Sequence, residues 1–502
     1  GKLLEPSFRY LQDMLDRSPV LRYQINMTTD HATIAEQELP DLAKYRRDTV
    51  LDMTCRTPLF EQTEFYKSFR SDTTKYFKKR MKKGRVAVCG NYEVLFGNPY
   101  EFLVALTDES YEPTESFSLE DGQVCTTGFA HGEMVLCARS PHITMGNLYL
   151  ARNTHSYDLL RYFNLTPNII CVNAIESNIQ QRLNGCDYDS DSMLVTNGKW
   201  LVNGAIAGYE LLKVPVCKVE PIGRSEYGNT PKHIAQLDQT IAKNKIGEIV
   251  NLSQFLNCLL WDGLFTEQGE HHPMDIYHDI CILAVLSGME IDKAKRLYAV
   301  DSAKVLARLR HYRQNFKKKN GGNLPSFYKF IVGDESADVG ENTAKFEAPM
   351  SFVHDAVASH NGRAAYTKTI PLSELFELDP TDAGANDTHK KQNIIAAVTE
   401  AHTKITTMQT AMKDADDDEK LILCGEANEV YQTCLKTVSK NVANDHILCM
   451  LLSEIDHPEK SKYGIKSCRH LLLACLLYEE NRRLLSKIKT VEGFEPYDLV
   501  RV

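Results

Sequence analysis

Short apolar runs and long amphipathic patterns alternate along this chain of 502 residues. Residues 1–84 show helical spacing that ends in EQTEFYKSFRSDTTKYFKKRMKK, and Gly84 is a typical helix stop. From Arg85 to about Val219 the chain changes to short β-rich runs broken by Gly, Asn and Pro: RVAVCG, YEVLFG, EFLVALT, QVCTTG, EMVLCA, NLYLA, NIICVN, MLVT and LKVPVCKV. So many short strands with irregular spacing predict a small closed β-barrel over 85–219.

Helical periodicity returns after the predicted barrel. The runs IAKNKIGEIVNLSQFLNCLL and MDIYHDICILAVLSGM each place apolar residues on one helix face, which predicts a helical region over 220–330. The segments VGDESADVGENTA and LDPTDAGANDTHK are typical of exposed linkers, and most of 331–502 favours helix. We therefore expect an α+β chain, with a barrel flanked by a helical N-terminal segment and a large helical C-terminal domain.

Composition places this chain among globular proteins, with 43% hydrophobic residues and ordinary charge content. No apolar run reaches about 18 residues and no signal-peptide pattern opens the sequence, which predicts a soluble, cytoplasmic protein. The fourteen cysteines lie in apolar contexts such as LLLACLL and lack zinc-type spacing. We interpret them as reduced, buried thiols.

Two basic segments stand out against a net charge of -9. Residues 75–85 (KYFKKRMKKGR) and 308–320 (RLRHYRQNFKKKN) both mix cationic and aromatic side chains. A solvated helix face is the ordinary explanation for either segment alone. Because they flank a carboxylate cluster in the sequence, we favour binding to a phosphate backbone.

That cluster is the stretch NGCDYDSDSMLV, in which Asp187, Asp189 and Asp191 occupy every second position. On an extended or tightly looped backbone the three carboxylates point to one side, and they repel one another unless a cation lies among them. Hard oxygen ligands suit Mg²⁺, Mn²⁺ or Ca²⁺. Since MLVT reads as a buried strand directly after the cluster, we prefer a metal site to a solvated acidic turn.

Two familiar carboxylate motifs do not fit this spacing. An EF-hand loop counted from Asp187 needs Gly at its sixth position and Glu at its twelfth, where this chain has Ser192 and Gly198. A phosphatase-type aspartate usually ends an apolar strand, and QRLNGC is not one. The remaining interpretation is a site where aspartates hold Mg²⁺ for a phosphoryl or nucleotidyl group.

Several segments together resemble a known family. GEMVLCARSPHITMGN followed by GCDYDSD is similar to the second double-psi β-barrel of two groups: the cellular RNA-dependent RNA polymerases of RNA silencing, with GSDLDGD, and the β′ subunit of multisubunit RNA polymerases, with NADFDGD. VLFGNPYEFLVAL, LEDGQVCTTG, NKIGEIVNLSQFLNCLLWD and ILAVLSGMEIDKAKR resemble silencing-polymerase segments in the same order. The resemblance spans about residues 85–296, and its short pieces favour a compact phage or mobile-element member.

The resemblance implies roles for individual residues. Asp187, Asp189 and Asp191 would hold the catalytic Mg²⁺ or Mn²⁺, and Arg139 would lie near the sugar of the bound nucleotide. Lys295 falls where the family carries a lysine in its helical region, which implies a substrate-binding role. The implied partners are ribonucleoside triphosphates, a nucleic-acid template and the RNA product, and no membrane.

Two departures from the family matter. The family usually has Gly before its third aspartate, whereas this chain has Ser190, so we expect a backbone there without a strictly positive φ. The polymerases also use a first barrel whose lysines face the aspartates, and residues 1–84 are too short to contain it. We therefore expect the C-terminal portion of a polymerase, or a chain whose lysine-bearing barrel is upstream or separate.

The leading hypothesis is the aspartate-bearing part of a two-barrel RNA polymerase. A nucleic-acid-binding scaffold without catalysis is one alternative, because a fold does not guarantee a function. A Mg²⁺-dependent nuclease or phosphohydrolase is another.

Overall fold

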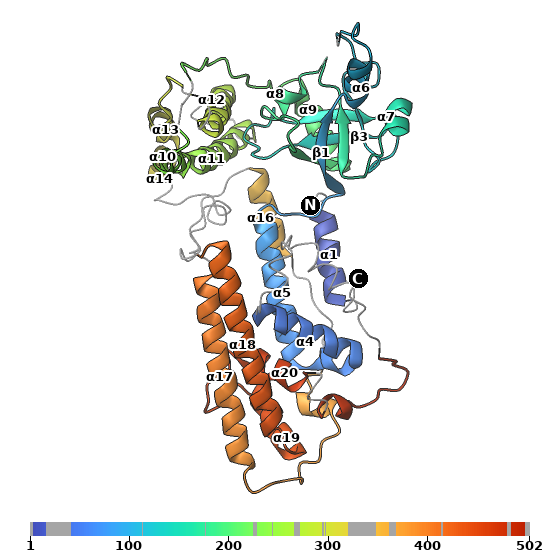
Figure 1. Ribbon diagram of the computed structural model, residues 1–502, viewed down its shortest axis with the longest axis vertical. Helices are drawn as coiled ribbons and strands as arrows, with labels where there is room; N and C mark the ends of the chain where they lie inside the picture. Colours follow the sequence, from blue (N-terminus) through green and yellow to red (C-terminus); the bar gives the residue numbers. More distant parts are fainter. Residues whose placement is uncertain are drawn as a thin grey trace. The chain divides into compact units, whose positions relative to one another are not determined.

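The computed structural model describes residues 4–16, 42–112, 114–175, 177–223, 228–242, 244–265, 272–293, 296, 298–319, 348–360, 368–412, 415–478 and 483–496 (Figure 1). Lys295 and the linker expected at 332–344 lie outside these residues. The chain divides into two compact units, one made of residues 1–9 and 78–361, the other of 10–77 and 362–502. The four-part division expected from the sequence stays a prediction.

The first unit contains a closed six-stranded barrel with the strand order β1-β5-β2-β4-β3-β6. The pairs β1/β5 and β2/β4 are parallel and the other four pairs are antiparallel. The strands are β1 (Gly90–Gly97), β2 (Gln123–Cys125), β3 (Met134–Ala138), β4 (Tyr149–Asn153), β5 (Ile169–Val172) and β6 (Ser192–Thr196). The prediction of an α+β chain with a barrel flanked by helical regions is confirmed.

Alternating apolar side chains fill this barrel. Val135 and Cys137 of β3 and Met193 and Val195 of β6 are fully buried, which is the period-2 pattern of strands with one face toward a core. Glu93 of β1 is also fully buried, opposite Met193 in the strand register. Burial raises the pKa of Glu93 to about 7, and neither carboxylate oxygen has a hydrogen-bond partner among the described residues.

Three of the nine expected strands are wrong. EFLVALT forms most of helix α6 (Pro99–Thr107), because Pro99 at the helix start presets a helical φ and a short apolar run fits helix as well as strand. Neither 85–89 nor 212–219 forms a strand. Three other helices also pack around the barrel, namely α7 (Tyr157–Tyr162), α8 (Ile179–Arg182) and α9 (Lys199–Tyr209).

A helical region completes the first unit. Its helices are α10 (Pro231–Ala242), α11 (Ile246–Phe265), α12 (Pro273–Asp292), α13 (Ser302–Leu309), α14 (His311–Lys319) and α16 (Pro349–Ser359). Helices α11 and α12 pack against each other around an apolar core that includes Ile143 from the segment after β3. Ser253 and Asn257 of α11 donate to the carbonyl of Ile143 at 2.9 and 3.0 Å. Tyr277 of α12 donates to the carbonyl of Lys213 at 2.8 Å, so these bonds fix α11 and α12 relative to the barrel.

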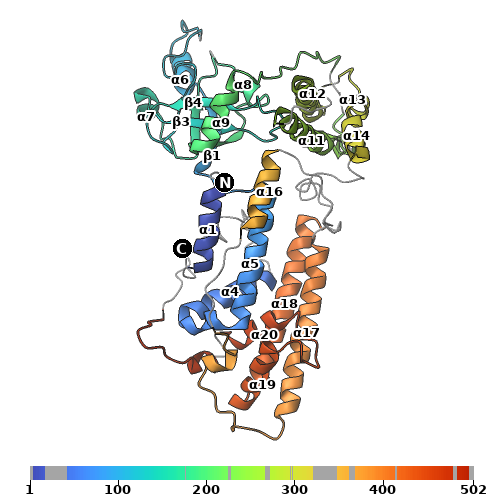
Figure 2. The same ribbon diagram turned by 180° about the vertical axis from the view of Figure 1, so that it is seen from behind.

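The second unit is helical (Figure 2), and its described helices pack around a shared apolar core. Helix α17 (Asp387–Ala411) forms a long hairpin with α18 (Asp417–Asn441), and Asp416, from the acidic run at 414–420, caps α18 through the Glu419 amide. The other elements are α4 (Leu42–Arg56), η2 (Pro58–Gln62), η3 (Leu372–Leu375), α19 (Asp445–Asp456), α20 (Arg469–Leu476) and η5 (Leu485–Lys487). Helices α1 (Glu5–Asp16) and α5 (Glu64–Lys82) each span a boundary between the two units in the sequence.

Candidate metal centre

The aspartate triplet lies in the loop between α8 and β6. Asn184 and Gly185 adopt φ of 58° and 67°, a left-handed turn that Gly and Asn tolerate best. The backbone carbonyl of Asp191 then accepts a hydrogen bond from the Leu95 amide of β1 at 2.9 Å. The loop is therefore anchored to the barrel at its C-terminal end, where the strand begins.

The loop gathers the three carboxylates. Asp187, Asp189 and Asp191 each offer an oxygen, and these oxygens lie within 4.8 Å of one another. Asp187 and Asp189 are exposed, whereas Asp191 is half-buried. Three converging carboxylate oxygens with solvent access fit a hard divalent cation such as Mg²⁺ or Mn²⁺, which usually keeps several waters or phosphate oxygens among its ligands. These residues could therefore hold the expected metal ion.

Arg139 belongs to the same cluster. It follows β3, and its guanidinium lies 2.7 Å from Asp191 Oδ2 and donates to the carbonyl of Leu183 at 3.3 Å. The backbone amide of Asp187 donates to the same Asp191 oxygen at 3.0 Å. Both charged side chains are half-buried, with 17% and 21% of their surfaces exposed. Arg139 thus orients the third aspartate, while the expected contact with a nucleotide sugar stays a prediction.

A tyrosine packs beneath the loop. The ring of Tyr188, between the first two aspartates, lies against Gly97 at the end of β1. A Cβ on Gly97 would lie 2.6 Å from Tyr188 Cζ, so the ring occupies the space that a side chain would need. Burial raises the pKa of Tyr188 to about 12. The contact between Gly97 and the Tyr188 ring therefore fixes how close the aspartate loop lies to β1.

The expectation for Ser190 is wrong. Its φ is 103°, in the range that favours glycine, although we expected a backbone without a positive φ. The turn between the second and third aspartates brings the chain back toward Arg139 and β6. This turn has a positive φ at Ser190. Ser190 therefore holds strain where the family usually has glycine.

The carboxylates open into a cleft of about 600 Å³. Its facing wall includes the C-terminal half of α12, where Ala284, Ser287 and Gly288 leave room because their side chains are small. Ser287 is 2% exposed, and its hydroxyl has no hydrogen-bond partner among the described residues. An added Cβ on Gly288 would meet nothing within 4 Å.

Sequence reasoning missed Ser287 and also Arg296, which lines the same cleft. Arg296 lies 3.9 Å from the Asp292 carboxylate. The Ser-Gly pair directly after the apolar run ICILAVL was the available signal for Ser287. Lys295 lies outside the described residues, so its expected role is untested.

The two basic segments contribute no lining residue to this cleft within the described part of the chain. Arg310 forms an ion pair with Glu248, and Arg308 lies 3.9 Å from Asp279. Part of their charge is therefore compensated within the protein, and a phosphate-binding role for these segments stays a prediction.

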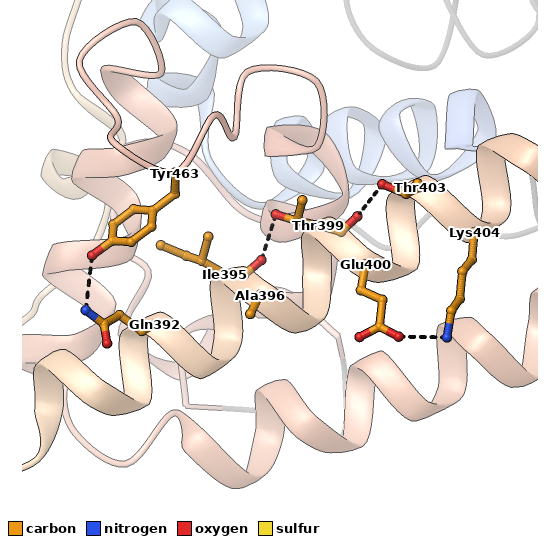
Figure 3. Close-up of a pocket in the computed structure, with 8 residues that line it drawn as sticks. All are labelled: Gln392, Ile395, Ala396, Thr399, Glu400, Thr403, Lys404 and Tyr463. Atoms are coloured by element: carbon orange, nitrogen blue, oxygen red, sulfur yellow. Dashed lines mark hydrogen bonds and ion pairs between the residues drawn. The ribbon is translucent and has the colours of Figure 1, made fainter.

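A second hollow, of about 680 Å³, lies along α17 in the second unit (Figure 3). Thr399 and Thr403 donate their hydroxyls to backbone carbonyls one turn earlier, at 2.8 and 2.9 Å. Glu400 and Lys404 pair at 2.7 Å. Because its polar groups bond locally, this hollow offers less for phosphate chemistry than the aspartate cleft does.

No helix in the described ranges has both the length and the apolar character needed to cross a bilayer.

Comparisons with known proteins add a structural likeness. No family model and no curated protein matches the sequence. Among solved structures, the chain is similar to the RNA dependent RNA polymerase QDE-1 from Thielavia terrestris, with 14% sequence identity and a TM-score of 0.47. The match covers 100% of this chain and 55% of that one, so the chain spans about half the length of that polymerase.

Proposed function

We propose that this chain is the aspartate-bearing part of a template-directed RNA polymerase, which transfers nucleotidyl groups from ribonucleoside triphosphates. The observation that carries the proposal is the convergence of the Asp187, Asp189 and Asp191 oxygens within 4.8 Å at a cleft of nucleotide size. Ligand sites typically enclose about 300–1,000 Å³. The ordered sequence segments that resemble the silencing polymerases support the same conclusion.

The three aspartates would hold the metal ion. A bound Mg²⁺ supplies positive charge that stabilises phosphate oxygens and favours deprotonation of an attacking hydroxyl. Arg139 keeps the Asp191 carboxylate oriented through the ion pair at 2.7 Å.

The charge of the cleft indicates that further cationic groups are needed before a triphosphate can bind there. Five carboxylates and two guanidinium groups line it, so negative charge exceeds positive charge by three, and one divalent ion would not reverse this excess. A triphosphate would therefore require further cations to approach. The lysine-bearing barrel implied by the sequence resemblance would supply them, and the described residues form a single closed barrel.

Primer extension tests the proposal directly. The 502-residue chain is assayed alone and joined to the polypeptide encoded upstream, with a labelled RNA primer on a template, ribonucleoside triphosphates and Mg²⁺ or Mn²⁺. We expect the longer version to extend the primer and Asp189→Asn to reduce extension by orders of magnitude. Asp121→Asn, outside the lining of the cleft, is the matched control.

Three other outcomes would contradict the proposal. Extension that survives Asp189→Asn would exclude the aspartates as the active site. Nucleotide release that depends on Asp189 without extension would indicate a nuclease. Nucleic-acid binding with no chemistry in any version would indicate a scaffold.

A further inference from the structure

Helix α6 turns a charged residue toward the protein and its apolar side toward solvent, which is the reverse of an ordinary surface helix. Its buried members are Pro99 and the charged Glu101, whereas Phe102 and Leu106 expose 62% and 68% of their surfaces and Leu103 is also exposed. A surface helix of a globular protein normally turns its apolar stripe inward. Here the apolar stripe at i, i+1 and i+4 faces solvent.

The inversion is fixed by hydrogen bonds. The Glu101 carboxylate accepts from the Ser116 hydroxyl at 2.7 Å, from the amides of Phe117 and Ser118 at 2.9 and 2.8 Å, and from the Ser118 hydroxyl at 2.8 Å. Burial by itself would raise the pKa of Glu101, but these bonds outweigh it and the pKa is lowered. The helix is therefore held by a buried charged anchor, and turning its apolar side inward would break four bonds.

The exposed apolar surface continues from α6 onto α7. These two helices pack against each other beside the barrel, as both views show (Figures 1 and 2). Tyr100 of α6 stacks on Tyr162 of α7 with ring centroids 5.5 Å apart. Tyr157 of α7 is 69% exposed, and Leu160 is also exposed. We define the α6–α7 patch by its exposed members, Phe102, Leu103, Leu106, Phe117, Tyr157, Leu160 and Tyr162.

The rim of this patch is acidic. Residues 99–120 include six carboxylates and no lysine or arginine, and Asp108, Glu109, Glu112 and Glu115 are exposed in the loop after α6. Arg161 of α7 lies 5.6 and 5.5 Å from the ring centroids of Tyr157 and Tyr162, so its charge faces aromatic rings. Phosphate backbones and anionic lipid headgroups would be repelled by this rim, whereas lysine and arginine side chains would be attracted.

We propose that the α6–α7 patch docks an amphipathic helix of a partner protein, with an apolar face for Phe102 and Leu106 and a border of lysine and arginine residues. Large exposed apolar patches with a polar rim mark interaction sites, and an apolar helix face laid against neighbouring helices is a recurrent recognition mode. The acidic rim favours a partner helix with a lysine and arginine border, and the charge pairs fix where along the patch that helix binds. This interaction is independent of the aspartate cleft and of its proposed chemistry.

Fluorescence anisotropy with two synthetic peptides tests the proposal on the full chain. One is a labelled Leu/Lys amphipathic helix, and the other is the same helix with Glu in place of Lys. We expect the Leu/Lys peptide to bind, the Leu/Glu peptide not to bind, and Phe102→Ser/Leu106→Ser to weaken binding by about tenfold or more. Leu211→Ser/Ile234→Ser is the control, because both residues are similarly exposed apolar positions elsewhere in the first unit.

A second pair of variants tests the charge component. Asp108→Asn/Glu109→Gln should weaken Leu/Lys binding and reduce its dependence on salt. Equal binding of both peptides, or an equal loss in the control variant, would overturn the proposal. Binding of anionic vesicles or single-stranded RNA that is lost in Phe102→Ser/Leu106→Ser would also overturn it, in favour of a membrane or a nucleic acid. Thermal unfolding confirms that each variant is folded.

Discussion

Gly97→Ala should disable the aspartate loop without changing an aspartate. The new Cβ would lie 2.6 Å from Tyr188 Cζ and 2.9 Å from both Cε atoms, whereas carbon atoms prefer separations of about 3.5–4.0 Å. The ring must therefore withdraw by roughly 1 Å. Overpacking of this kind typically costs about 1–3 kcal/mol.

The displacement should reach the metal ligands, because Tyr188 is bonded on either side to Asp187 and Asp189. Metal sites tolerate ligand shifts of only about 0.2 Å. We expect Gly97→Ala to weaken Mn²⁺ binding by about 10–100-fold, the range found when residues that orient metal ligands are changed. Isothermal titration measures the affinity, and thermal unfolding measures the loss of stability.

A double variant separates this mechanism from general misfolding. Tyr188→Ala removes the ring, so Gly97→Ala/Tyr188→Ala should bind Mn²⁺ more tightly than Gly97→Ala alone. Gly204→Ala in α9 is the control, because its added Cβ meets nothing within 4 Å and should leave Mn²⁺ binding unchanged. The reasoning fails if Gly97→Ala binds Mn²⁺ as the parent does, or if removal of the ring restores nothing.

Three further substitutions test the backbone strain at Ser190, the buried carboxyl group of Glu93 in the barrel, and the space beside Gly288 in the cleft. Ser190→Gly should stabilise the chain by about 1 kcal/mol in urea unfolding, because it relieves a φ of 103°, whereas Ser190→Ala keeps the Cβ and should not. Glu93 has its pKa raised from 4.5 to about 7, so the folded state holds the proton that the unfolded state releases. Its stabilising contribution is complete below pH 4.5 and is lost as pH rises to about 7. Glu93→Gln should remove this pH dependence, which amounts to about 3 kcal/mol. Gly288→Leu should leave Mn²⁺ binding intact but weaken binding of a non-hydrolysable nucleoside triphosphate by about tenfold or more, since it fills the cleft. Gly247→Leu in α11 is the control, because its added Cβ also has no neighbour within 4 Å, and it should change neither Mn²⁺ binding nor nucleotide binding. If Gly288→Leu leaves nucleotide binding unchanged, the nucleotide binds elsewhere.

Several features of the fold followed from local pattern. Six of the nine expected strand runs cover most of the six barrel strands, because a strand with one buried face needs alternating apolar residues. EFLVALT shows where local pattern fails, since an apolar run of seven residues satisfies a helix and a strand equally. The buried Glu101 decided which face of that helix turned inward, and its partners at 116–118 lie 15 to 17 residues away.

The sequence by itself determined the candidate ligands, because Asp187, Asp189 and Asp191 are close in the chain and any tight loop brings such neighbours together. Tertiary structure decided everything that depends on chain segments far apart. Arg139 meets Asp191 across 52 residues only because β3 and β6 pair in the closed barrel. The C-terminal half of α12 lines the aspartate cleft because bonds from α11 and α12 to the segments around Ile143 and Lys213 position those helices. Such contacts depend on how the whole unit closes, and no local spacing encodes that closure.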